Sequence, residues 1–130
     1  MSQDLVLKWG IASAGLISGK FCNAILSLDS KFHELIAVGA RDLNDAKVFA
    51  ERFKMPFHFG SYDQMIESKE INIVYVGTIT VTHKDVCLKA IKEGKHVLCE
   101  KPMSMNSKDH EEVLQAAKNK GVFFMEASLI

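Results

Sequence analysis

Short apolar runs alternate along the chain with longer stretches in which apolar residues recur at helical spacing. In one such stretch, Ala46, Phe49, Ala50 and Phe53 stand at i, i+3, i+4 and i+7, which predicts one apolar stripe on a helix. The apolar runs have the length of strands and occupy residues 6–12, 35–40, 57–59, 71–76, 96–99 and 122–125. The pattern therefore predicts six strands with a helix after each of the first five.

This alternation decides the expected fold class. Strands that are separated by helices cannot pair as tight hairpins, and they form right-handed crossovers in a parallel sheet. The continuous apolar run 35–40 also suits a strand that is covered on both faces. We therefore expect an α/β fold, a doubly wound parallel (Rossmann) sheet of about six strands. No linker or repeat divides the chain, so residues 1–130 are expected to form one domain.

Polar residues and glycines mark where the helices begin and end. Asp42 and Ser61 are each expected to cap a helix with a side-chain oxygen, and Thr82 is expected to do the same for a later helix. Gly94 and Gly121 can adopt the left-handed conformation that ends a helix.

Composition and charge narrow the class of protein. Hydrophobic residues make up 48% of the chain and charged residues 25%, which is the balance of an ordinary globular protein. Sixteen Lys and Arg against sixteen Asp and Glu give a formal net charge of zero. That balance argues against nucleic acid or an anionic membrane as a partner, and it leaves a local anion site open.

The cysteines and the hydropathy of the chain indicate a cytoplasmic protein. Cys22, Cys87 and Cys99 are odd in number and form no C-x-x-C pair, so we expect neither a disulfide framework nor a metal site. Residues 1–10 include Asp4 and lack the apolar stretch of a secretory signal, and no apolar run is long enough to span a bilayer.

The first candidate site is the glycine-containing segment 10–19, which follows the first apolar run. A helix N-terminus offers unpaired N–H groups and a partial positive charge, which suit a pyrophosphate. In a G-x-G-x-x-G pattern, Ser13, Gly15 and Ser18 take the three glycine places, and only the middle glycine is kept. The position at the first strand–helix junction favours a dinucleotide site, and an ordinary tight turn is the alternative.

The second candidate is Arg41, at the carboxyl end of the second predicted strand. An acidic residue at this place accepts hydrogen bonds from a ribose 2′-hydroxyl, whereas an arginine pairs with a 2′-phosphate. Asp42 is adjacent, so the two interpretations compete. We assign the helix cap to Asp42 and the phosphate to Arg41, which favours NADP over NAD. A surface arginine paired with Asp45 is the alternative.

Two further segments follow later strands and reach the same edge of the sheet. Thr78 is expected to line the cofactor cleft, and His83 is either a structural or a functional histidine. Glu100 and Lys101 enter a turn at Pro102, a candidate for a cis peptide bond. A lysine there can hydrogen-bond a substrate hydroxyl or lower the pKa of a neighbouring acid. An exposed ion pair without function is the alternative.

Together these segments resemble the glucose–fructose oxidoreductase and inositol dehydrogenase (Gfo/Idh/MocA) family, and within it the dimeric dihydrodiol dehydrogenases. The resemblance rests on Trp-Gly-Ile at 9–11 with its Ser-Ala-Gly turn, Gly-Ser-Tyr at 60–62, His83, and Val-Leu-Cys-Glu-Lys-Pro at 97–102. Segments 40–43, 49–50 and 125–127 extend it over nearly the whole chain.

The resemblance implies an NADP-dependent oxidoreductase that takes hydride from a cyclic trans-diol or an aldopyranose such as xylose. Carried over by position, the residues that cradle the pyrophosphate are Ser13, Ala14, Gly15, Leu16 and Ile17. The resemblance also implies that Arg41 holds the 2′-phosphate and that Thr78, Ile79 and His83 line the cleft. It places Glu100 near the nicotinamide end and implies that Lys101 assists proton removal.

The family's chain continues beyond 125–127 into an α+β domain with the substrate pocket, a proton-transferring residue and the dimer interface. Here Ser128, Leu129 and Ile130 stand where an aromatic residue and an arginine are expected. We therefore expect a nucleotide-binding domain that lacks the substrate domain and shows no turnover by itself. The alternatives are a fragment that binds a dinucleotide or a partner chain through its open face, and a remnant without a ligand.

Overall fold

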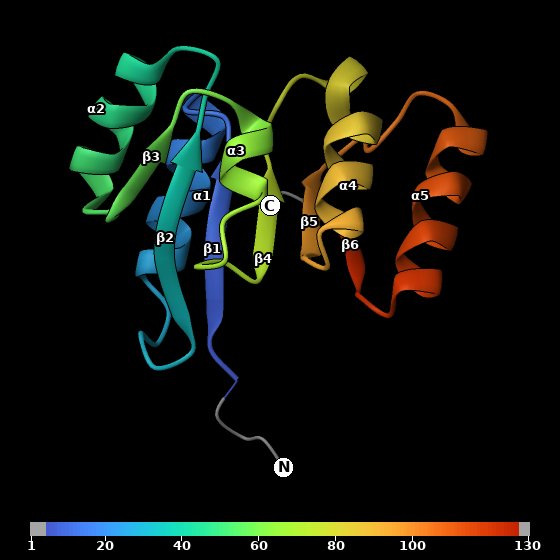
Figure 1. Cartoon of the computed structure of the whole chain (residues 1–130), viewed down its shortest axis with the longest axis horizontal. Helices are drawn as coiled ribbons and strands as arrows, with labels where there is room; N and C mark the ends of the chain where they lie inside the picture. Colours follow the sequence, from blue (N-terminus) through green and yellow to red (C-terminus); the bar gives the residue numbers. More distant parts are fainter. Residues whose placement is uncertain (1–4, 128–130) are drawn as a thin grey trace.

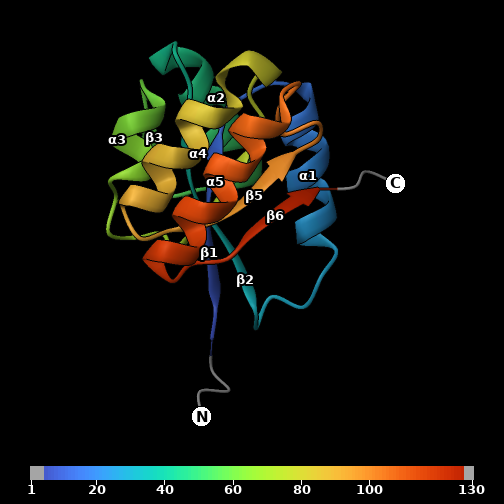
Figure 2. The same ribbon diagram turned by 90° about the vertical axis from the view of Figure 1, so that its right-hand side faces the viewer.

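A six-stranded parallel sheet forms the centre of the molecule, and helices cover both of its faces (Figures 1 and 2). The computed structural model describes residues 5–127. The strands are β1 (Leu7–Ala12), β2 (His33–Gly39), β3 (Phe57–Phe59), β4 (Ile73–Val76), β5 (His96–Glu100) and β6 (Phe124–Ala127). The helices are α1 (Leu16–Leu26), α2 (Leu43–Phe53), α3 (Tyr62–Ile66), α4 (His83–Lys92) and α5 (Ser107–Lys120), with a 3₁₀ turn, η1 (Thr80–Thr82), before α4.

The strand order is β3-β2-β1-β4-β5-β6, which confirms the doubly wound sheet. The chain moves outward from β1 to β3 and then crosses back to place β4 beside β1. The connections on either side of this point leave in opposite directions, and open sheets of this kind bind ligands in the crevice that results. The carboxyl ends of β1 and β4 are therefore the place to look for a site.

Each face of the sheet has its own apolar core. α1 and α2 pack on one face around Trp9, Ile11 and Phe49, and α3, α4 and α5 pack on the other around Val74 and Val97. All four residues of β4 are buried, as expected of a strand that is covered on both sides.

The predicted helix ends are confirmed at four places, including Gly94, which has the left-handed conformation just after α4, and they are wrong at one. The carboxylate of Asp42 accepts hydrogen bonds from the N–H groups of residues 44 and 45, and Ser61 Oγ accepts one from residue 64. Gly121 ends α5 in the left-handed conformation. Thr82 does not cap α4, because its hydroxyl turns back to the Ile79 carbonyl and η1 runs directly into the helix.

Two strands, β4 and β6, begin two residues later than the apolar runs predict. Ladder pairing of β6 starts at Phe124, because Val122 still donates its N–H to the Ala117 carbonyl and so belongs to the end of α5. Pairing of β4 starts at Ile73, and Asn72 before it binds the backbone of Lys8 through its side chain. Residues 128–130, where the sequence departs from the family pattern, lie outside the described residues.

Candidate functional site

The turn between β1 and α1 presents an open helix N-terminus. Ser13 has φ of 105°, a conformation that favours glycine, and it occupies the first glycine place of the motif. Its N–H donates to the Gly39 carbonyl, and its Oγ accepts from the N–H of Gly15 at 3.1 Å. Gly15 begins α1 without a side-chain cap. The first N–H groups of α1 therefore remain available to an anion.

The backbone at this helix end is also exposed among residues 5–127. Gly15 is exposed, and a Cβ placed on it would meet the Ser13 hydroxyl at 3.3 Å. Leu16 is 79% exposed, so its side chain does not cover the turn. The turn thus combines the two features that a pyrophosphate needs, which are unpaired N–H groups and a backbone that a ligand can approach.

Gly77 provides the close helix–strand packing that the motif normally obtains from its third glycine. Ser18 takes that third place and is fully buried, and its hydroxyl has no hydrogen-bond partner among residues 5–127. A Cβ on Gly77 would lie 2.6 Å from Ser18 Oγ and 2.7 Å from Cε2 of Tyr75. This role of Gly77 was not expected from the sequence, although a glycine directly after a fully apolar strand was an available signal.

Arg41 and Asp42, the two charged residues after β2, make different contacts. Arg41 and Asp42 are both exposed, but the Asp42 carboxylate is occupied by the N–H groups at the start of α2. Within residues 5–127 no ion pair joins Arg41 to Asp45. Arg41 therefore holds a free positive charge at the carboxyl edge, next to the β1–α1 turn.

His83 lies beneath the carboxyl edge and connects two loops. It is 1% exposed, with Nε2 2.8 Å from the Thr78 carbonyl and Nδ1 3.0 Å and 3.2 Å from the carbonyls of Pro102 and Met103. Carbonyl oxygens accept only, so both ring nitrogens must donate. Burial opposes the charge of the imidazolium, but the contacts with Cys99 and with these carbonyls outweigh it and raise the pKa of His83 to about 9.

Glu100 and Lys101, at the end of β5, differ in their surroundings. Glu100 is 7% exposed, and its Oε2 accepts a hydrogen bond from the hydroxyl of Tyr75, which is fully buried. Burial and this hydrogen bond raise the pKa of Tyr75, so its phenol stays protonated. Lys101 is exposed and precedes a cis peptide bond to Pro102. The two residues are therefore not an exposed pair.

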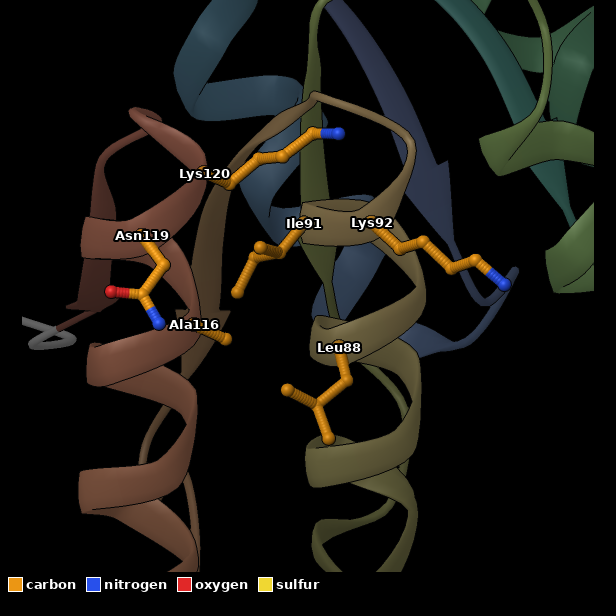
Figure 3. Close-up of a pocket in the computed structure, with 6 residues that line it drawn as sticks. All are labelled: Leu88, Ile91, Lys92, Ala116, Asn119 and Lys120. Carbon is orange, nitrogen blue, oxygen red and sulfur yellow. The ribbon is translucent and has the colours of Figure 1, made fainter.

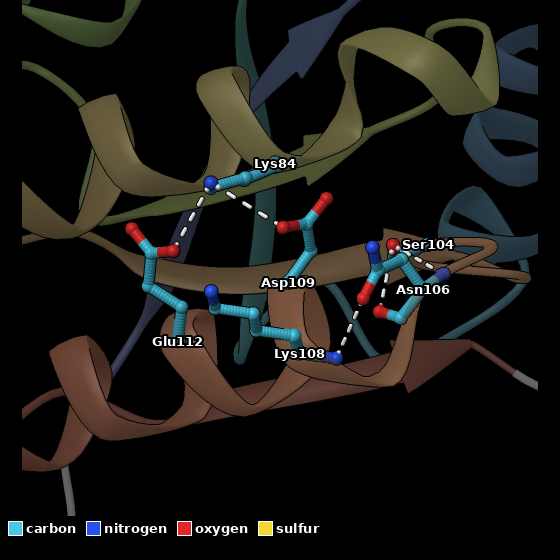
Figure 4. Close-up of polar contacts among 6 residues, drawn as sticks. All are labelled: Lys84, Ser104, Asn106, Lys108, Asp109 and Glu112. Atoms are coloured by element: carbon cyan, nitrogen blue, oxygen red, sulfur yellow. Dashed lines mark hydrogen bonds and ion pairs between the residues drawn. The ribbon is translucent and has the colours of Figure 1, made fainter.

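Polar contacts hold the loop that follows Lys101 in place (Figure 4). Glu126 of β6 accepts a hydrogen bond from the N–H of Met103 at 2.8 Å. Asn106 caps α5 through the N–H of Lys108, and Ser104 accepts a hydrogen bond from the N–H of Asn106. Lys84 of α4 lies 3.4 Å from Asp109 and 3.0 Å from Glu112, which joins the first turns of α4 and α5. These contacts fix the position of the β5–α5 loop.

The structure brings most of the predicted residues to one edge. The 13–17 turn, Thr78 and Ile79, and Glu100 and Lys101 follow the neighbouring strands β1, β4 and β5, while Arg41 follows β2 on the other side. Ile79 is 67% exposed, whereas His83 offers no free ring nitrogen. The edge suits an elongated ligand with an anionic middle, a second anionic group near Arg41, and a reactive end near Lys101.

A groove between the last turns of α4 and α5 lies at the opposite end of the sheet (Figure 3). Its lining residues are Leu88, Ile91, Lys92, Ala116, Asn119 and Lys120. In crossovers of this kind, helices run antiparallel to the strands, so their C-terminal ends meet the amino edge of the sheet. This groove is therefore separate from the candidate site. Within residues 5–127, no helix has the length and apolar composition needed to cross a bilayer.

Comparison with known proteins places the chain in a family. The profile of the Gfo/Idh/MocA oxidoreductases, described as an oxidoreductase family with an NAD-binding Rossmann fold, matches residues 7–128. The chain is 44% identical over 123 residues to trans-1,2-dihydrobenzene-1,2-diol dehydrogenase of Xenopus laevis. The match covers 95% of this chain and 37% of that protein, so the chain spans little more than a third of its relative's length.

Solved structures of similar fold contain either nicotinamide cofactor. KijD10, a 3-ketoreductase from Actinomadura kijaniata in complex with NADP and TDP-benzene, is 27% identical with a TM-score of 0.87, over 93% of this chain and 37% of that one. GenD2 from gentamicin A biosynthesis, in complex with NAD, is 23% identical with a TM-score of 0.86, over 95% and 34%. On the family profile and the doubly wound sheet, this chain belongs to the Gfo/Idh/MocA oxidoreductase family and forms its NAD(P)-binding Rossmann domain.

Proposed function

We propose that this chain binds NADP along the carboxyl edge of its sheet, as the cofactor domain of an oxidoreductase that acts on a cyclic trans-diol or an aldopyranose. The observation that carries the proposal is the uncapped, exposed start of α1 behind Gly15, with Arg41, which makes no ion pair within residues 5–127, at the end of the neighbouring strand. Helix N–H groups suit the diphosphate, and a guanidinium suits a 2′-phosphate.

The proposed preference for NADP over NAD rests on the different contacts of Arg41 and Asp42 at the end of β2. An NAD site needs a carboxylate that is free to accept hydrogen bonds from a ribose hydroxyl. Asp42 uses its carboxylate to cap α2, and it leaves Arg41 to meet the ligand. The NADP bound to KijD10 is in line with this choice, since that protein shares the fold and is 27% identical to this chain over the aligned part.

The remaining roles follow the order of the strands along the edge. Ser13, Ala14, Gly15, Leu16 and Ile17 would hold the diphosphate, with Thr78, Ile79 and His83 forming or supporting the cleft wall. Glu100 would lie near the nicotinamide and Lys101 near the substrate. NADP supplies the carbon that accepts hydride when it is bound, and Lys101, an exposed cation, would hydrogen-bond the substrate hydroxyl and assist removal of its proton.

Residues 1–130 are proposed to bind the cofactor without oxidising a diol. Catalysis needs donors and acceptors on several sides of the substrate, and the described residues provide them only from the carboxyl edge. Tyr75 cannot serve as the second proton-transfer group, because it is fully buried and engaged with Glu100. The proposed compartment is the cytosol, since Cys22, Cys87 and Cys99 are all free and buried.

Isothermal titration of the chain with NADPH, NADH and 2′,5′-ADP tests the proposal. We expect NADPH to bind at micromolar concentration and NADH at least tenfold more weakly, with 2′,5′-ADP retaining part of the NADPH affinity. An assay with trans-dihydrodiols and xylose should show no turnover. Failure to bind any of the three ligands at millimolar concentration would contradict the proposal, and turnover by the chain alone would contradict its second part.

A further inference from the structure

A buried chain of side chains runs from α1 to the end of β5. The ring of Phe21, on α1, stacks on the ring of Tyr75 with centroids 3.9 Å apart and an interplanar angle of 4°. The hydroxyl of Tyr75 then donates its hydrogen to Oε2 of Glu100. Tyr75 is fully buried and Glu100 is 7% exposed, so little solvent reaches this hydrogen bond.

The sheet geometry explains why these groups meet. Tyr75 pairs with Leu98 in the ladder between β4 and β5, and Glu100 stands two residues further along β5. Residues two apart on a strand face the same side, so Tyr75 and Glu100 share the face that α1 covers. Gly77 leaves room for the tyrosine ring, since a Cβ there would lie 2.7 Å from its Cε2.

Such a carboxylate depends on the donor that it faces. A buried carboxylate without a hydrogen bond is strongly disfavoured, and a hydrogen bond to a charged group is among the stronger ones in proteins. The raised pKa of Tyr75 keeps its hydroxyl protonated and available as the donor. Phe21 and Gly77 limit where the ring can lie, so the oxygen that Tyr75 holds has a defined position at the carboxyl edge.

We propose that Tyr75 is a positioning residue of the cofactor site, which holds the Glu100 carboxylate at the nicotinamide end of the bound dinucleotide. This inference rests on the proposed function, because it needs the dinucleotide to lie along the carboxyl edge. Since Phe21 belongs to the helix whose N-terminus would bind the diphosphate, the same contacts set the position of Glu100 relative to that helix.

The test separates the two halves of the cofactor. Tyr75→Phe removes the hydroxyl and keeps the ring that stacks on Phe21. We expect this variant to bind NADPH about five- to tenfold more weakly, the range of one hydrogen bond to a charged group. 2′,5′-ADP lacks the nicotinamide half and would bind near the end of β2, away from Glu100. The affinity of the variant for this ligand should therefore change less than about twofold, because the lost hydrogen bond does not face it.

Two further variants give the test its controls. Glu100→Gln keeps the shape of the side chain and removes its charge, and it should lower NADPH affinity as Tyr75→Phe does. The double variant should be hardly weaker than either single one, because each single change already removes the hydrogen bond between the hydroxyl and a charged carboxylate. Tyr62→Phe makes the same chemical change at the start of α3, on the other face of the sheet, and should leave both affinities unchanged.

The outcomes distinguish this inference from the function on which it rests. A wild-type chain that binds neither ligand contradicts the proposed function and the inference with it. If the wild type binds NADPH but Tyr75→Phe weakens NADPH and 2′,5′-ADP equally, or weakens neither, only the positioning role is overturned. Thermal unfolding of each variant shows whether it folds, and Glu100→Gln carries the same test if Tyr75→Phe does not.

Discussion

The two ends of the proposed site are built in different ways. At the β1–α1 turn the functional groups are backbone N–H groups at the uncapped start of α1, and both Gly15 and Arg41 are exposed. At the ends of β4 and β5 the groups that set the geometry are buried side chains, above all His83 and the Tyr75–Glu100 pair.

Because of this difference, residues at one end should contribute mainly to ligand affinity and residues at the other mainly to the stability of the fold. An exposed cation or an open helix end contributes to the affinity for an anion, and its loss disturbs little of the fold. A buried group with several hydrogen bonds contributes to the fold itself, because its removal leaves its partners unpaired in a region shielded from solvent. Substitutions at the two ends should therefore give different ratios of lost affinity to lost stability.

The largest effect is expected for His83→Gln. The two ring nitrogens of His83 donate to carbonyls on opposite sides, and the single side-chain NH2 group of glutamine cannot reach both sides. The carbonyl of Thr78 or those of the 102–103 turn would therefore lose their partner. We expect the free energy of unfolding at pH 6 to fall by about 3 kcal/mol, as measured by urea denaturation. His58→Gln, at an exposed histidine of β3, is the matched control and should have little effect.

The same histidine should make stability depend on pH. Folding raises the pKa of His83 from 6.5 to about 9, so the folded chain binds the proton more tightly than the unfolded one. This stabilisation is complete below pH 6.5 and is lost as the pH rises through about 9. The difference in stability between wild type and His83→Gln should therefore shrink between pH 6 and pH 10. An unchanged difference would show that His83 is not the titrating group.

Arg41→Ala should act on affinity alone. Loss of a charge-assisted contact to the 2′-phosphate is expected to weaken NADPH binding by about 2 kcal/mol, and NADH binding far less. The urea midpoint should stay that of the wild type, since Arg41 is exposed and makes no ion pair with Asp45. Lys47→Ala removes the same charge from the exposed side of α2 and serves as the control. Equal losses for NADPH and NADH would reject the assignment of Arg41.

Gly77→Ala probes the contact between the two ends. The new methyl group would meet Ser18 Oγ and the Tyr75 ring, and we expect α1 to move away from β4 to make room for it. Overpacking of this kind should lower stability by about 1.5 kcal/mol, measured by thermal or urea unfolding. Affinity should fall together with stability, because the helix that binds the diphosphate is displaced. Gly94→Ala is an unsuitable control, since Gly94 has a positive φ, and Gly60→Ala, with its nearest contact at 3.4 Å, is the better one.

The smallest effect has the opposite sign. Ser18→Ala removes a buried hydroxyl that has no hydrogen-bond partner within the described part of the chain. We expect the free energy of unfolding to rise by about 1 kcal/mol, because alanine also favours the helix more than serine does. Unfolding in urea measures the change, with NADPH affinity as the second readout. A loss of affinity without a loss of stability would mean that the hydroxyl serves the ligand.

Much of the architecture was predictable from residues close together in the chain. Apolar runs and helical stripes are local patterns, and Asp42 and Ser61 cap helices through residues two or three positions away. The handedness of the crossovers follows from general sterics, so the doubly wound sheet could be expected before any contact was known. The β1–α1 turn and Arg41 could be placed for the same reason, because each directly follows a strand.

The supporting contacts of the site depended on the folded chain. Tyr75 and Glu100 are 25 positions apart, and His83 and Pro102 are 19 apart. Ser18 and Gly77 meet only because α1 packs across β4. No local pattern records such pairs, since hydrogen bonding and close packing depend on distance in space. The residues proposed to face the ligand could therefore be named by motif and position, whereas those that hold them in place required the tertiary structure.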